Sequence, residues 1–226
     1  MRERDWIGQA GELFEAAMFR GDPDAPARSD EVLDAVEAPL ALARGKMLHV
    51  RFLGDRVERP EELGLFERAA ELYRRLGDGR GEADALFWIG CWHQVVKGEG
   101  PAGVPYFERS YALARDTGDR RTMSYAVRHL GFADKDAGRF ERARERLTES
   151  VALRREIGFP AGEAAGLVAL GYLAAETGDP ATAFGRLDEA RKVAASCGAE
   201  AVSGWVEEAQ RLIGERELRD EGGARA

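Results

Sequence analysis

The stretch that decides the fold is RTMSYAVRHLGFADKDAGRFERARERLTESVALRREIG, residues 121–158. Positions expected to face inward recur in it at steps of three and four, the spacing of one face of an α-helix. These are Val127, Leu130, Gly131 and Asp134 in the first half, and Phe140, Ala143, Leu147, Ser150 and Leu153 in the second. The run from Asp136 to Gly138 separates the halves, because Gly readily adopts the left-handed conformation that ends a helix. The stretch therefore predicts a helical hairpin, which must pack on further helices to bury both faces.

The same hairpin recurs along the chain. Gly131 has counterparts at Gly90 and Gly171, at spacings of 41 and 40 residues. The glycine that closes each unit also recurs every 40 or 41 residues, at Gly77, Gly118, Gly158 and Gly198. A large apolar residue stands eleven positions before each of these, namely Phe66, Phe107, Leu147 and Leu187. A fixed period of two helices per unit is the sequence signature of a helical solenoid.

Three segments resemble the first helix and turn of tetratricopeptide repeats: LFWIGCWHQ at 86–94, VRHLGFADKDAGRFERA at 127–143 and LVALGYLAAETGDPATA at 167–183. Ala143 and Ala183 match the small residue of that family, and Gly103 takes its place after one inserted residue. The period exceeds the usual 34, the closing Pro is absent, and the usual aromatic site holds His93, Asp134 and Ala174. The resemblance covers about residues 39–214 and is closest to the elongated repeats of bacterial regulators.

We therefore predict an all-α, right-handed solenoid of helical hairpins with about ten helices. One domain should span residues 1–218, with N-terminal helices over 1–38, about four repeats over 39–198 and a capping helix over 199–217. Residues 219–226 should form a disordered tail. Ser29 or Asp30 should cap the second helix, and Pro39 should bend or divide it.

The amino-acid composition limits the classes of partner and the compartment that we expect for this chain. The net charge of −8 argues against a nucleic-acid surface, because phosphate binding depends on Lys and Arg. No apolar run approaches the ~20 residues that span a bilayer, and the N-terminal stretch lacks the pattern of a signal peptide. Cys91 and Cys197 lie too far apart to pair easily, which fits free thiols in a reducing cytoplasm. The Ala, Gly, Arg and Glu bias suggests a GC-rich bacterial genome.

A second stripe follows each first helix beside the packing positions. By resemblance to the family, this stripe lines the concave face. It supplies the candidate residues for binding a ligand or partner, which are Phe87, Cys91, Tyr125, Arg128, Phe132, Lys135, Tyr172 and Trp205. Such an apolar patch indicates a binding site when exposed. The alternative is that several of these aromatics pack against the next unit.

Other motifs give weaker indications of a cofactor, a metal site or a catalytic residue. Residues 98–103 match G-x-G-x-x-G but follow a helix, so we reject a dinucleotide site. None of the three histidines, His49, His93 and His129, has a His or Cys partner at metal-binding spacing, and we expect neither metal nor cofactor. Trp88 and Trp92 favour core packing. Asp134, five residues after His129, is the one candidate for a buried catalytic acid.

These observations favour a non-catalytic cytoplasmic scaffold that holds a peptide or a helix of a protein partner on its concave face. The main alternative is a receptor or sequestering protein for a hydrophobic small molecule, held around Phe87, Cys91, Tyr125 and Trp205. An enzyme on this scaffold has no motif in its favour. The sequence sets no oligomeric state.

Overall fold

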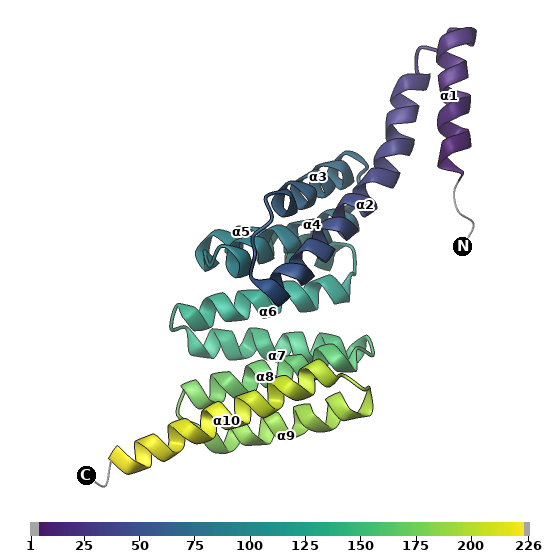
Figure 1. The fold of residues 1–226 in the computed structure, drawn as a ribbon. Coiled ribbons are helices and arrows are strands. Elements are labelled where there is room, and N and C mark those ends of the chain that lie inside the picture. Colours follow the sequence, from purple (N-terminus) through teal and green to yellow (C-terminus); the bar gives the residue numbers. More distant parts are fainter. Residues whose placement is uncertain (1–4, 224–226) are drawn as a thin grey trace. The chain divides into compact units, whose positions relative to one another are not determined.

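The computed structural model describes residues 5–223, with side chains as far as Arg216. All regular structure in this range is helical (Figure 1), which confirms the predicted all-α repeat fold. The chain divides into two compact units, one ending at Thr117 and one beginning at Gly118. A single domain over residues 1–218 stays a prediction.

The first unit holds α1 to α5 and one short π-helix. The bounds are Trp6–Arg20 for α1, Ala25–Asp55 for α2, Glu61–Arg75 for α3, Gly79–Cys91 for α4, Trp92–Val96 for the π-helix η1 and Gly100–Asp116 for α5. Figure 1 shows α1 lying along the first part of α2, while α3 packs on the later part of α2 and on α4. A core that includes Leu42, Phe66 and Ile89 joins these later helices.

The second helix differs from its prediction. It begins at Ala25 rather than near Ser29, with Pro26 in its first turn, where a missing N–H group costs nothing. Pro39 lies inside α2 and does not divide it. The buried Ala38 and Leu42 on either side explain this continuity, because tertiary packing of that face outweighs the hydrogen bond that proline removes.

The π-helix accounts for the one inserted residue in the repeat. A π-helical turn holds one more residue than an α-helical turn, so η1 restores the register before α5 begins. Gly103 consequently still meets Gly90, as a Cβ built on Gly103 would lie 2.7 Å from the Gly90 carbonyl oxygen. The spacing of 41 rather than 40 residues thus has a local structural cause.

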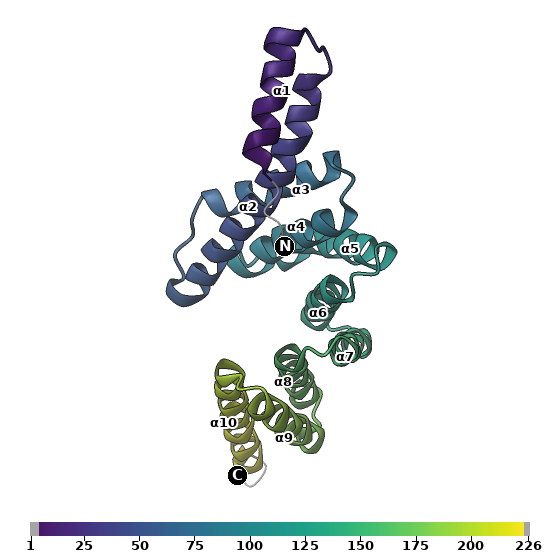
Figure 2. The same ribbon diagram turned by 90° about the vertical axis from the view of Figure 1, so that its right-hand side faces the viewer.

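The second unit is a stack of five helices. They are α6 (Arg120–Asp136), α7 (Phe140–Glu156), α8 (Pro160–Glu176), α9 (Pro180–Ser196) and α10 (Glu200–Gly223). Figure 2 shows α6, α8 and α10 on one side of this stack and α7 and α9 on the other. The turns close on glycines with positive φ, which are Gly138 at 72°, Gly158 at 63°, Gly178 at 79° and Gly198 at 66°. This confirms the role predicted for the closing glycines.

Small residues bring the paired helices of the second unit together. Ala143 and Ala183 are fully buried. A Cβ on Gly131 would lie 3.0 Å from the Leu147 side chain, and one on Gly171 would lie 3.1 Å from the Leu187 side chain. These contacts hold α6 against α7 and α8 against α9.

The last helix extends past its predicted end near Glu217, because α10 runs to Gly223. The residues before Gly222 are mostly good helix formers, so no stop signal precedes it. The helix therefore includes residues 219–223 of the predicted disordered tail, and residues 224–226 lie outside the described residues. None of the described helices is long and apolar enough to cross a membrane.

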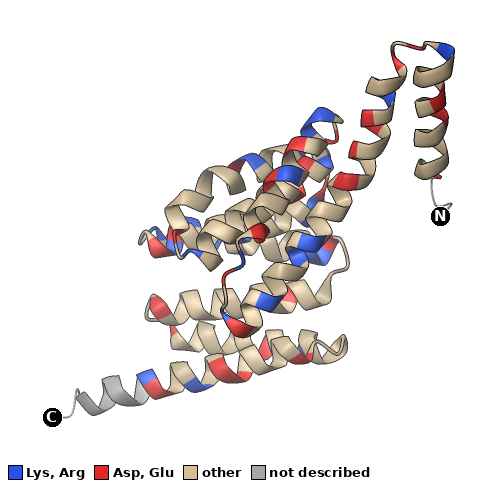
Figure 3. Ribbon diagram, turned by 45° about the horizontal axis from the view of Figure 1, so that its top comes forward, with Lys and Arg blue, Asp and Glu red and all other residues tan. Residues whose placement is uncertain are grey.

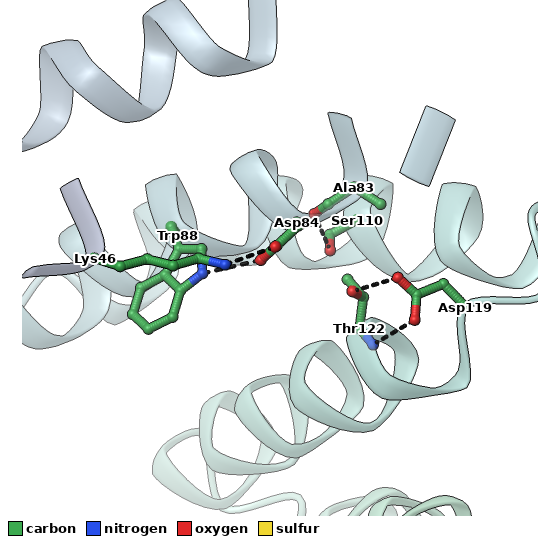
Figure 4. A network of polar contacts seen from close by, with 7 residues as sticks. All are labelled: Lys46, Ala83, Asp84, Trp88, Ser110, Asp119 and Thr122. Carbon is green, nitrogen blue, oxygen red and sulfur yellow. Dashed lines mark hydrogen bonds and ion pairs between the residues drawn. The ribbon is translucent and has the colours of Figure 1, made fainter. Parts of the chain in front are cut away.

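Polar contacts fix the ends and faces of helices within each unit. In the first unit, the Asp84 carboxylate accepts from Lys46 at 2.7 Å and from the Trp88 indole at 3.0 Å (Figure 4). In the second unit, Asp119 caps α6 by accepting from the backbone and hydroxyl of Thr122. Basic and acidic side chains are interspersed along the helices, as Figure 3 shows.

Candidate functional site

A cavity of about 960 Å³ lies in the second unit on the side formed by α6, α8 and α10. Its lining is Arg128, Phe132 and Lys135 from α6, Val168, Ala169, Tyr172, Ala175 and Glu176 from α8, and Trp205, Glu208, Leu212, Ile213 and Arg216 from α10. The structure thus brings five of the predicted site residues together. These are Arg128, Phe132, Lys135, Tyr172 and Trp205.

The apolar lining has a closed floor and an exposed edge. Val168, Ala169 and Ile213 are buried and contribute the floor. Trp205 is 48% exposed and Leu212 is 40% exposed, both on α10. A ligand in the cavity would therefore cover apolar surface that is now open to water.

Arg128 is a cationic residue of the cavity with no acidic partner among the described residues. Its guanidinium lies over the Phe132 ring, 5.0 Å from the centroid, and is partly buried. Among the residues that the structure describes, no carboxylate lies within ion-pair distance of it. Burial lowers the pKa of Arg128 to about 9, and the nearby Arg154 charge acts in the same direction.

Lys135, the second cation from α6, is already neutralised. Its ammonium group lies 2.9 Å from Asp136 and 3.4 Å from Glu176. The hydrogen bond that the Lys135 ammonium donates to Asp136 is the main cause that raises the pKa of Lys135. Lys135 therefore closes one edge of the cavity by linking α6 to α8.

Tyr172 lines the cavity from α8. Burial is the main cause that raises the pKa of its hydroxyl, and the Glu208 carboxylate adds to the effect. Glu208 therefore places negative charge near Tyr172 on the α10 side of the cavity, whereas Arg128 lies on the α6 side.

Tyr125 does not line the cavity. Its ring lies 6.1 Å from that of Phe159 and 5.1 Å from the guanidinium of Arg154. Arg154 is 1% exposed and donates to the Gly162 carbonyl at 2.7 Å, a bond between α7 and α8. Tyr125 and Arg154 therefore form part of the packing beneath the Arg128 end of the cavity.

Phe87 and Cys91 lie in the first unit and are buried, with 3% and 2% exposure. The Phe87 ring packs 5.2 Å from Trp88 and 5.9 Å from Phe107. Burial raises the pKa of the Cys91 thiol well above its usual value. For these two positions the structure favours the packing interpretation over a groove.

Trp88 and His93 also serve packing. Trp88 stacks on Phe66 with ring centroids 5.8 Å apart, and His93 stacks on Tyr106 at 5.4 Å. These contacts join α4 and η1 to their neighbours in the first unit.

Asp134 is a buried acid held by arginines. It is 1% exposed and lies 2.7 Å from Arg139, 2.6 Å from Arg146 and 3.4 Å from Arg142. The cluster joins the end of α6 to the start of α7, and this accounts for an acid at a packing position. Asp134 does not line the cavity.

Eight lining residues lie outside the candidates named from the sequence, namely Val168, Ala169, Ala175, Glu176, Glu208, Leu212, Ile213 and Arg216. Trp205 was the candidate on the last helix, and Glu208 lies about one turn after it. Continuing in steps of four reaches Leu212 and Arg216, so the helical period contained the signal.

No protein-family model matches the chain, and no curated protein matches it. Among solved structures, it is similar to the crystal structure of aspartyl phosphate phosphatase F from Bacillus subtilis, with a TM-score of 0.52. The two sequences are 12% identical, and the match covers 98% of this chain and 73% of that chain. This similarity supports the tetratricopeptide-like helical-repeat fold.

Proposed function

We propose that the chain is a non-catalytic binding scaffold that holds a peptide or a helix of a protein partner in the cavity formed by α6, α8 and α10. The observation that carries the proposal is the open apolar cavity itself. Phe132 and Tyr172 line it half-buried, and Trp205 is 48% exposed. Because these rings are already partly buried, covering one contributes less than the ~1.5–3 kcal/mol gained by burying a fully exposed apolar side chain.

A hydrophobic small molecule is the second candidate. The cavity volume of about 960 Å³ lies at the upper end of the range for small-molecule sites. The exposure of Trp205 and Leu212 favours a larger partner, because small-molecule sites enclose most of their ligand.

A catalytic role has less support in this cavity. Its described lining holds no Ser, Cys, His or Asp. Asp134, the candidate acid from the sequence, is paired with arginines instead. The proposal is therefore one of binding.

The test is capture of the natural ligand by the full chain in its own host. Tagged protein is recovered gently and examined by native mass spectrometry, beside a variant carrying Phe132→Ala and Tyr172→Ala. Phe19→Ala is the control, because Phe19 is an exposed aromatic, 76% accessible, on α1. Circular dichroism checks that each variant folds.

We expect a bound peptide or protein on the wild type and the control and none on the double variant. Capture that survives both cavity substitutions would show that the ligand binds elsewhere. A dissociable mass of a few hundred daltons, lost in the double variant and not a peptide, would favour the small-molecule candidate.

A further inference from the structure

The helix α2 carries apolar residues on two of its faces. One face, which includes Leu42 and Gly45, is buried against α3 and α4. The other face is exposed, and its apolar residues recur at steps of three and four, at Leu40, Ala43, Met47 and Val50. We call these four residues the α2 stripe. A surface helix normally has a single apolar face, so the second one indicates that another helix packs against it.

The helix α1 covers this face of α2 over its first half only. Steps of three and four backwards from the α2 stripe reach residues that are half-buried or buried where α1 lies (Figure 1), namely Val36, Val32, Ser29 and Ala25. The lengths of 15 residues for α1 and 31 for α2 correspond to about 22 Å and 46 Å. The uncovered half of the face therefore has room for a second helix as long as α1.

The helix α1 has an exposed apolar stripe of its own. Its members recur at steps of four, three and four, at Ile7, Gly11, Phe14 and Met18. We call these four residues the α1 stripe. It lies off the side of α1 on which Ala16 is buried. A single copy of the chain thus leaves two apolar stripes of similar length open to water.

The charged residues beside the two stripes have opposite signs. Those beside the α1 stripe are Glu12 and Glu15, and those beside the α2 stripe are Arg44, Lys46 and Arg51. Lys46 is held in an ion pair within the unit. The other four are exposed and form no ion pair among the residues that the structure describes. Packing α1 on α1, or α2 on α2, would bring like charges together, so the signs favour α1 on α2.

We propose that the chain forms a twofold-symmetric dimer in which the α1 stripe of each copy packs on the α2 stripe of the other copy. One copy cannot make this contact with itself, because the short turn at residues 21–24 holds its α1 along the first part of its own α2. The twofold contact covers all four stripes at once, so the assembly closes at two copies. The six large stripe side chains of each copy are 47–67% exposed, and twice that number suits the roughly 1,200–2,000 Å² that a specific interface buries. The dimer uses the first unit and does not depend on a ligand in the cavity.

The two stripes also fit each other in size. Because α1 lies along the first part of its own α2, it reaches the later part of the other α2 only when the two α2 helices are antiparallel. Each α1 then runs parallel to the α2 on which it packs. The steps of four, three and four in the α1 stripe recur from Ala43 to Gly54 on α2. In that register a Gly or Ala faces a large side chain in three of four layers, which are Ile7 with Ala43, Gly11 with Met47 and Met18 with Gly54.

The first test measures the mass of the full chain by sedimentation equilibrium over a range of concentrations, against 24.8 kDa for one copy. Phe14→Glu and Met47→Glu each place a charge in one stripe. Phe19→Glu is the control, because Phe19 is an exposed aromatic of α1 that lies off the stripe. Circular dichroism checks that each variant folds.

We expect the wild type and the control to form a dimer of twice that mass. Each stripe variant should raise the dissociation constant by about tenfold or more, as the loss of a central interface contact does. A wild type that stays monomeric across the whole range would overturn the proposal, and so would a dimer that withstands both stripe variants.

Reversing the charges distinguishes α1 on α2 from the two like pairings. Glu12→Arg with Glu15→Arg, or Arg44→Glu with Arg51→Glu, should each weaken the dimer several-fold, and more at low salt than at high salt. All four changes in one chain should restore the dimer, because opposite charges then face each other again. Weakening without restoration, or no effect of either reversal, would overturn the pairing of α1 with α2.

Discussion

At the scale of residues, Arg128 and Asp134 show two outcomes for a buried charge on the same helix. Asp134 is paired with arginines that follow it in sequence, so its charge is used within the fold. Arg128 has no such partner among the described residues. The contrast indicates that one charge stabilises the unit and the other is available to a ligand.

Replacing Arg128 by Met should stabilise the unliganded chain. Burial lowers the pKa of Arg128 well below its usual range, to about 9, which means that the folded state disfavours its charged form. This destabilisation is fully present below about pH 9 and is relieved as the pH rises above that value. At pH 7 the substitution removes it, for a gain of about 1 kcal/mol and a rise in Tm of roughly 4 °C.

Differential scanning calorimetry without ligand checks this expectation. Arg186→Met is the control that should change little, because Arg186 is an exposed residue of α9 outside the cavity. A clear fall in Tm for Arg128→Met alone would mean that the guanidinium stabilises the fold, and would contradict the view that its buried charge is a cost to the unliganded chain.

Replacing Asp134 by Asn should destabilise the chain strongly. The change removes the charged acceptor that three arginines share, of which Arg139 and Arg142 stay more than half exposed to water, so the cost should be about 1.5–3 kcal/mol, as for hydrogen bonds to a charged group. Asp188→Asn is the matched control, because Asp188 forms an exposed pair with Arg191 and should cost less than about 1 kcal/mol. Urea unfolding measures both. Similar small losses for the two variants would show that the arginine cluster adds little.

At the scale of elements, helix contacts depend on a few small residues. Gly103 lets α5 approach the backbone of α4, since a Cβ there would lie 2.7 Å from the Gly90 carbonyl oxygen. Gly103→Ala should therefore force the helices apart and cost about 1–3 kcal/mol.

Gly185→Ala is the opposite case within the middle of α9. A Cβ at Gly185 meets nothing within 4 Å, so Ala should stabilise that helix by about 0.5–1 kcal/mol. Thermal unfolding of both variants tests the pair. A Gly103→Ala variant as stable as the wild type would show that the close approach of α4 and α5 is not required.

The helix boundaries show what local patterns can predict. The closing glycines were placed correctly, because a left-handed turn has a strong local preference for Gly. Pro39 does not divide α2, since the tertiary contacts that keep this helix continuous are absent from a local pattern, and a bend there stays a prediction. The one-residue insertion was visible as a spacing, but its form as the π-helix η1 required the structure.

At the scale of the whole molecule, the repeat period correctly placed residues at the cavity of the second unit, but their counterparts in the first unit are buried in packing instead. Positions offset by 40 residues on α6, α8 and α10 meet at one cavity, as Phe132, Tyr172 and Leu212 do. The counterpart of Phe132 in the first unit, 41 residues earlier, is Cys91, which is buried at 2% exposure. The period fixes which helix face a residue occupies, whereas the bulk of its neighbours decides whether that face stays open.

The first unit offers the main rival surface for a partner. Five large apolar side chains on α1 are exposed, namely Trp6, Ile7, Phe14, Met18 and Phe19. They carry no charge that selects a ligand, but their exposure makes α1 the proper comparison for any test of the cavity.

The most direct test of the account is photocrosslinking in the host with p-benzoylphenylalanine placed at Tyr172 or at Phe19 of the full chain. We predict an adduct with a peptide or protein partner from position 172, lost when Phe132→Ala is added, and none from position 19. An adduct from position 19 with none from 172 would contradict the central claim that the cavity formed by α6, α8 and α10 is the binding site.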